Sequence, residues 1–168
     1  MKVSLYTFVG VFSRALDTLA HVLNKGAEFA KAKGVSEAEM LEWRLAPDMF
    51  PLRRQAHIVI DFSRQWLARA AGVDVPASFE GETTLAEIQA AIADAKAYVN
   101  SFKPEQFEGR DEVPLTVNIG VMEPTFPVGQ WVPGFALVNL MFHLSMAYGI
   151  LRHKGVEIGK RDLFAGGL

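Results

Sequence analysis

The sequence predicts an all-α fold, a four-helix bundle in a single domain that spans residues 1–168. Three observations lead to this prediction. Apolar residues recur every three or four positions through most of the chain. Two capping boxes, Ser36 with Glu39 and Thr84 with Glu87, indicate where helices begin. The run from Pro124 to Leu151 contains no charged residue, which is typical of a helix inside a core.

The first half of the chain predicts two long helices and one short one. A helix from about residue 4 to residue 33 ends at Gly34, and the first capping box begins a short helix over residues 37–43. A connection with two prolines leads to a second long helix over residues 51–71, for which Pro51 suits the first turn and Gly72 the end. Residues 73–81 are expected to form a loop.

The second half predicts two more long helices separated by a segment of different character. The second capping box begins a helix that Lys103 and Pro104 end. Alternating apolar residues over positions 112–128 predict a short β-hairpin or an extended loop between the third and fourth long helices. The fourth helix is expected over residues 130–154, followed by a tail over residues 156–168 that packs only in part.

Composition excludes several classes of function. The net charge is -2 and no basic stripe is present, so we expect no nucleic-acid partner. The absence of cysteine excludes disulfides, thiolate nucleophiles and cysteine-based zinc sites, and it suits a cytoplasmic location. The charge-free run is long enough to span a membrane, but its polar residues and prolines favour a buried helix and no membrane partner.

Asn139 and His143 are the candidate functional pair, because they lie one turn apart on one face of an otherwise apolar helix. The pair could belong to a metal or acid–base site, or it could be a core pair satisfied by hydrogen bonds to other helices, which we favour. On the second long helix, Gln55 flanks the apolar face and is better placed to meet His143. His57 is the better metal ligand, but with Asp61 it falls mostly on the far side, as a surface pair.

Two further residues, Asp48 and Tyr148, are candidates to line a pocket, although their spacing does not require it. The sequence contains no glycine-rich phosphate loop, no nucleophile elbow and no His-Glu-x-x-His motif.

Over nearly its whole length the chain resembles the DinB/YfiT-like superfamily of metal-dependent bundles, and in particular an uncharacterised bacterial branch of it. Three stretches carry the resemblance. They are Leu45-Ala-Pro-Asp-Met-Phe-Pro-Leu52 with Gln55, the residues Phe142-His143, Ala147-Tyr148 and Ile150-Leu151-Arg152-His153, and finally Gly159-Lys160-Arg161-Asp162.

The resemblance implies a site of three histidines, one on the second long helix and a His-x-x-x-His pair on the fourth. Here the pair is Asn139-x-x-x-His143, and the third position falls at Gln55 or, less well, at His57. One histidine of three is matched, and amide oxygens are weak ligands for zinc or nickel.

Two hypotheses about function follow from this comparison. The favoured one is a metal-free bundle with a degenerate site that binds a small molecule or acts as an interaction module. The alternative is an enzyme with zinc or nickel at His143, resembling a thiol transferase or a hydrolase, whose metal lowers the pKa of a bound thiol or water. The resemblance also implies a homodimer.

Overall fold

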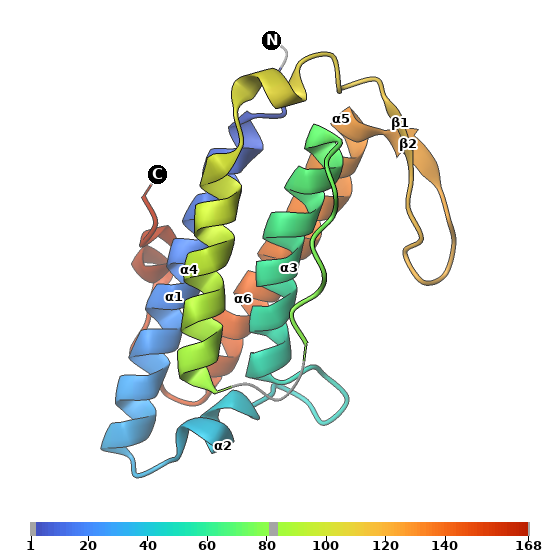
Figure 1. Cartoon of the computed structure of the whole chain (residues 1–168). Helices are drawn as coiled ribbons and strands as arrows, with labels where there is room; N and C mark the ends of the chain where they lie inside the picture. Colours follow the sequence, from blue (N-terminus) through green and yellow to red (C-terminus); the bar gives the residue numbers. More distant parts are fainter. Residues whose placement is uncertain (1–2, 81–83, 168) are drawn as a thin grey trace.

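A computed structural model describes residues 3–80 and 84–167, and within them four long helices form a bundle (Figure 1). The long helices are α1 (Thr7–Ala32), α3 (Leu52–Ala71), α4 (Leu85–Ser101) and α6 (Leu137–His153). The short helix α2 (Glu37–Leu41) joins α1 to α3 and ends two residues before the predicted boundary. The all-α bundle predicted from the sequence is confirmed.

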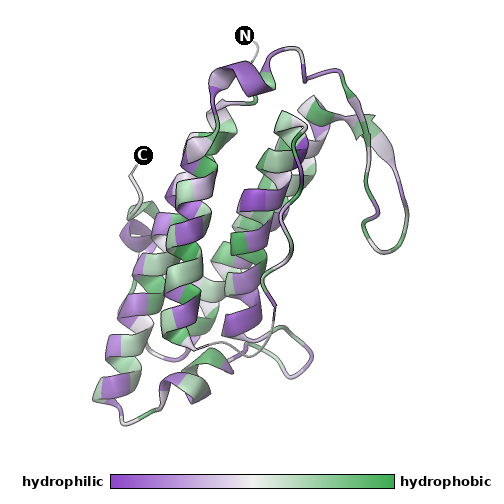
Figure 2. Cartoon of the chain, viewed as in Figure 1, coloured by the Kyte–Doolittle hydropathy of each residue, from purple (hydrophilic) through white to green (hydrophobic). Residues whose placement is uncertain are grey.

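Local signals in the sequence position these helices. Ser36 accepts a hydrogen bond from the Glu39 amide, and Thr84 forms a complete capping box with Glu87. Gly72 ends α3 with φ of +72°, a left-handed conformation that glycine adopts without steric cost. Polar and apolar residues alternate around α1 and α4, which bury one side each (Figure 2).

The order of the helices includes a crossover that spans the bundle. Residues 72–80 return along the length of α3, and α4 then runs parallel to α3, whereas α1 and α6 run in the opposite direction (Figure 1). The loop predicted over residues 73–81 is present up to residue 80, and Gly81 lies outside the described residues. Side chains of α3 hold this segment, since Gln65 donates to the Pro76 carbonyl at 3.1 Å.

The predicted hairpin is present between α4 and α6. After a 3-10 turn (η1, Pro104–Phe107), β1 (Pro114–Thr116) pairs antiparallel with β2 (Thr125–Pro127), and Leu115 lies opposite Phe126. Its base is fixed to the bundle, because the Trp131 indole N–H donates to the Leu115 carbonyl at 2.8 Å. The rest of the hairpin extends away from the helices (Figure 1).

The fourth long helix has three parts. It consists of α5 (Val128–Trp131), a π-helical turn (η2, Val132–Ala136) and α6. By length and composition, Val128–His153 is the one helix among the described residues that could cross a membrane, and 33% of its apolar window is buried. The expectation that the whole charge-free run lies in the core is therefore wrong, since one side of α6 faces outward.

The core lies between the four long helices. Fully buried side chains come from all of them, including Phe12, Leu16, Leu19 and Leu23 of α1, Ile60 and Leu67 of α3, Ile88 of α4, and Leu140, Leu144 and Ile150 of α6. The tail packs more closely than expected, because Val156 and Ile158 are buried and the 3-10 turn η3 (Lys160–Phe164) rests on α1.

Candidate functional site

The centre of the candidate site is a hydrogen bond between α3 and α6. His143 Nδ1 lies 2.7 Å from Gln55 Oε1. Gln55 is buried in the first turn of α3, and its Nε2 donates to the Phe50 carbonyl at 3.1 Å. His143 is half-buried on α6. The structure thus brings Gln55, and not His57, to His143.

These contacts fix the tautomer of the neutral imidazole. The Phe50 carbonyl can only accept, so the nitrogen of the Gln55 amide must face it and the amide oxygen must face His143. The Nδ1 atom of His143 therefore carries the hydrogen and donates a hydrogen bond to Gln55 Oε1. The Nε2 atom is left with its lone pair, free to accept a hydrogen bond or to act as a base.

Electrostatics keep this imidazole neutral. Burial lowers the pKa of His143 below its usual 6.5, and the positive charge of Arg54 lowers it further. At pH 7 the ring is accordingly the neutral Nδ1–H tautomer. The surroundings of the ring are aromatic, with the Phe142 ring centroid at 5.1 Å and that of Phe62 at 6.5 Å.

The Phe62 ring begins a continuous aromatic cluster that leads from His143 to the hairpin. Phe62 contacts Phe135 at 6.1 Å between centroids, and Phe135 contacts both Trp66 and Trp131 at 5.4 Å. Sequence reasoning did not assign Phe62 or Phe135 to the site. The available signal was the position of Phe62 seven residues after Gln55, which is two turns along the same face of α3.

Asn139 lies beside this arrangement and bonds within its own helix. Its Nδ2 donates to the Phe135 carbonyl at 3.0 Å, four residues earlier. Asn139 is half-buried, and no hydrogen bond between it and His143 is found among the described residues. The two side chains share a side of α6, but the network joins His143 to α3 alone.

His57 and Asp61 are buried, so the expectation of a surface pair is wrong. The returning segment of residues 72–80 covers them. Phe79 packs edge-on against the His57 ring at 4.8 Å, and its amide donates to the Asp61 carboxylate at 2.9 Å. Arg64 donates to the same carboxylate at 2.7 Å. Burial, aided by Arg54 and Arg53, lowers the pKa of His57 from 6.5 to about 4.

Among the described residues, no hydrogen bond joins Asp48 or Tyr148 to His143 or Gln55. Asp48 is exposed in the connection between α2 and α3, and Tyr148 is half-buried on α6, where it packs against the core. The role of both in a pocket stays a prediction.

The residues present do not fit the metal that the superfamily implies. The Gln55 oxygen already accepts from His143, and Asn139 can offer only an amide oxygen. His57 is enclosed beneath Phe79. Among the described residues, no group of three or more His, Cys, Asp or Glu side chains is arranged to hold a metal. One imidazole with two amides is a poor donor set for zinc or nickel.

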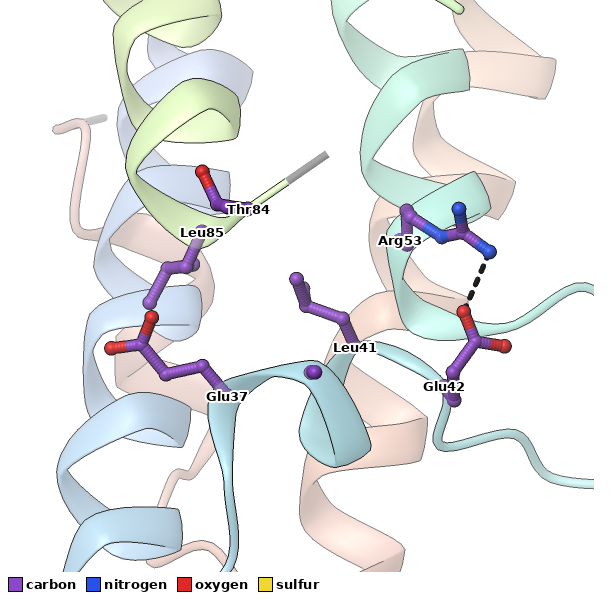
Figure 3. A pocket seen from close by; sticks show the side chains of 7 residues that line it. Glu37, Leu41, Glu42, Arg53, Thr84 and Leu85 are labelled. Atoms are coloured by element: carbon purple, nitrogen blue, oxygen red, sulfur yellow. Dashed lines mark hydrogen bonds and ion pairs between the residues drawn. The ribbon is translucent and has the colours of Figure 1, made fainter. Parts of the chain in front are cut away.

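A cavity of about 710 Å³ lies among α2 and the first turns of α3 and α4 (Figure 3). Glu42 and Arg53 form an ion pair at its edge, with 2.6 Å between their charged atoms. Arg53 is two residues before Gln55, so the two side chains leave α3 in nearly opposite directions. This cavity is therefore separate from the His143 site.

Comparison with known proteins identifies the relatives of this chain. The model of the family described as "Domain of unknown function (DUF1993)" matches residues 5–164. A crystal structure of a DinB family member protein from Shewanella denitrificans superposes with a TM-score of 0.88 at 34% sequence identity, covering 95% of this chain and 90% of that one. No curated protein matches the chain.

Proposed function

Since the chain belongs to the DUF1993 family and has the fold of a DinB family member, we propose that it is a metal-free DinB-like bundle that binds a small molecule at His143. The observation that supports this most directly is the hydrogen bond from His143 to Gln55, whose amide is itself held by the Phe50 carbonyl. At the position where a metal site would have a second strong ligand, this chain has Gln55, which orients the imidazole of His143.

The chemistry of the site indicates what it would bind. A neutral imidazole with its Nε2 lone pair available accepts a hydrogen bond from an O–H or N–H group. The rings of Phe62 and Phe142 favour an aromatic body, and the positive charge of Arg54 favours a donor that is weakly acidic. A phenol has these properties, so we use phenol as the probe.

The alternative is the metal-dependent enzyme, with zinc or nickel at His143 and chemistry resembling that of a thiol transferase or a hydrolase. One observation favours it. Histidine ligands of metals commonly donate their second ring N–H to a carbonyl group, as His143 does to Gln55. A metal bound at His143 would still lack two strong protein ligands.

Metal content of protein purified without a polyhistidine tag separates the two. We expect less than a tenth of an equivalent of zinc, nickel or iron, and the same response of the melting temperature to added metal in wild type and in His143→Ala. One equivalent of metal that is absent from His143→Ala would overturn the proposal and favour the enzyme. The exposed His153, changed to alanine, controls for unspecific binding by surface histidines.

Binding is tested by titrating phenol and following the ring signals of His143 by NMR. We expect a saturable change at His143 with none at His153, and loss of binding in His143→Ala. Because that variant also leaves Gln55 unpaired, Phe62→Leu serves as a second variant that keeps the hydrogen bond and weakens the aromatic contact. Phenol binding that is unchanged in both variants, or absent from the wild type, would contradict the proposal.

A further inference from the structure

The guanidinium of Arg54 carries a positive charge beside the His143 site. Arg54 is exposed in the first turn of α3, one residue before Gln55. Its charge is close enough to lower the pKa of both His143 and His57. Within residues 3–80 and 84–167, no ion pair includes Arg54.

The described groups around this guanidinium do not offset its charge. The preceding Arg53 already pairs with Glu42, with 2.6 Å between their charged atoms. Helix α6, which brings His143 to the site, is without charge as far as Leu151, because no charged residue occurs between positions 124 and 151. The imidazole of His143 is itself neutral at pH 7. The unbalanced charge of Arg54 therefore favours a ligand with an anionic group.

Phe50 supports the Arg54 guanidinium from one side. The central carbon of the guanidinium lies over the Phe50 ring, 5.9 Å from its centroid. A guanidinium held over a ring keeps the N–H groups at its edge available, and in the described part of the chain these groups form no hydrogen bond to a protein acceptor. The ring of Phe50 is 52% exposed, so a ligand can approach the guanidinium from solvent.

The same residue organises the imidazole half of the site. The Phe50 carbonyl accepts from Gln55 Nε2 at 3.1 Å, and Gln55 Oε1 lies 2.7 Å from His143 Nδ1. The ring of Phe50 therefore positions a cation, while its carbonyl orients His143 through Gln55. A group that binds anions and a group that accepts a hydrogen bond thus belong to one arrangement.

We propose that the ligand of this site is an aromatic acid, whose carboxylate binds the Arg54 guanidinium while a hydroxyl group on its ring donates to His143 Nε2. The inference rests on the proposed function, because it requires a ligand at His143. A carboxylate suits this position better than a phosphate, since it matches the planar guanidinium with two parallel hydrogen bonds and one cation balances its single charge. A hydroxybenzoate is the simplest molecule with both groups, and Arg54 determines its specificity.

Binding of phenol, benzoate, 3-hydroxybenzoate and 4-hydroxybenzoate, followed through the ring signals of His143 by NMR, is the first test. We expect at least one hydroxybenzoate to bind at least tenfold more tightly than either phenol or benzoate, because it alone uses both groups. Two isomers are used since they place the carboxylate at different distances from the hydroxyl group. A rise in salt concentration should weaken the binding of the hydroxybenzoate and leave that of phenol unchanged.

Variants of Arg54 separate the carboxylate from the hydroxyl group. Arg54→Gln should weaken the hydroxybenzoate at least tenfold and phenol less than threefold. Arg54→Lys keeps the charge but not the planar fork, so it should recover only part of the lost affinity. Arg161→Gln is the matched control, because Arg161 is exposed on η3, which rests on α1, and it should leave the affinity for both probes unchanged.

The support from Phe50 has its own test. Phe50→Leu removes the ring beneath the guanidinium and keeps the carbonyl that holds Gln55. It should therefore weaken the hydroxybenzoate at least threefold with little effect on phenol, and Phe50→Tyr, which restores a ring, should bind both probes as the wild type does.

The outcomes distinguish this inference from the proposed function. A wild type that binds neither phenol nor a hydroxybenzoate would overturn both. Phenol binding at His143 without tighter binding of either hydroxybenzoate would overturn the aromatic acid alone. A hydroxybenzoate that binds Arg54→Gln as tightly as the wild type would contradict the role of Arg54, and benzoate that binds as tightly as the hydroxybenzoates would contradict the role of the hydroxyl group.

Discussion

Acid should destabilise the folded chain through His57, which is 2% exposed and packs edge-on against Phe79. The folded chain holds this pKa at about 4, below the 6.5 of an unfolded histidine. The unfolded chain therefore takes up the proton first as the pH falls. The contribution of neutral His57 to stability is complete above pH 6.5 and is lost as the pH falls from 6.5 towards 4.

The two pKa values give the size of the effect. Because the unfolded chain binds this proton more strongly than the folded chain, lowering the pH from 7.5 to 5 should lower the free energy of unfolding by about 2 kcal/mol. His143 acts in the same direction, because burial and Arg54 lower its pKa as well. Acidic side chains also titrate in this range, so the comparison must be made between variants.

Urea unfolding at pH 7.5, 6.5, 5.5 and 5.0 measures the effect in wild type and in His57→Gln. His57→Gln should lower the free energy of unfolding at pH 7.5, since an amide replaces a buried ring. Between pH 7.5 and pH 5, however, the free energy of unfolding should fall by about 2 kcal/mol less in the variant than in the wild type. His153→Gln, at the exposed end of α6, should follow the wild type throughout. Parallel pH profiles for His57→Gln and the wild type would refute the reasoning.

Two further predictions concern the crossover segment and the end of α3. Asp61→Ala removes the acceptor of the Phe79 amide and the ion pair of Arg64, which keeps only its hydrogen bond to the Ala77 carbonyl, and it should cost about 2 kcal/mol in urea unfolding. Asp94→Ala on the exposed side of α4 should stay within about 0.5 kcal/mol. Gly72→Ala should cost at least about 1 kcal/mol in the same assay, because φ is +72° and the new methyl group would meet the Arg110 guanidinium. A Gly72→Ala variant as stable as the wild type would contradict the strain argument.

The sequence predicted the helices because their signals are local. Capping residues and apolar periodicity act within one or two turns, which is why α3 begins at Leu52 and α4 begins directly after the Thr84 cap. The pairing of Gln55 with His143 could also be predicted, since the prediction needs only the phase of each residue on its own helix.

The environment of His57 could not be predicted in the same way. The helical phase of His57 and Asp61 correctly predicts that they point away from the apolar face of α3. Phase does not reveal what covers the opposite side of the helix. The covering segment returns through Phe79, which is 18 residues after Asp61, and no local pattern marks that contact. Helical phase therefore predicts a surface position for side chains that the crossover segment buries.

The outward face of α6 was missed for a related reason, and its composition explains why. A helix with one apolar side reveals its orientation, whereas α6 has apolar residues towards the core, at Leu140 and Leu144, and towards the outside, at Val138 and Met141. Its composition alone cannot distinguish a buried helix from one that a partner covers.

His143 lies between the two apolar sides of α6, facing α3, and its ring is 5.1 Å from that of Phe142. The Phe142 ring therefore borders the proposed ligand site while its side chain is 52% exposed on the outward side of α6. One helix, α6, thus contributes to the core through Leu140 and Leu144 and to the proposed ligand site through His143 and Phe142.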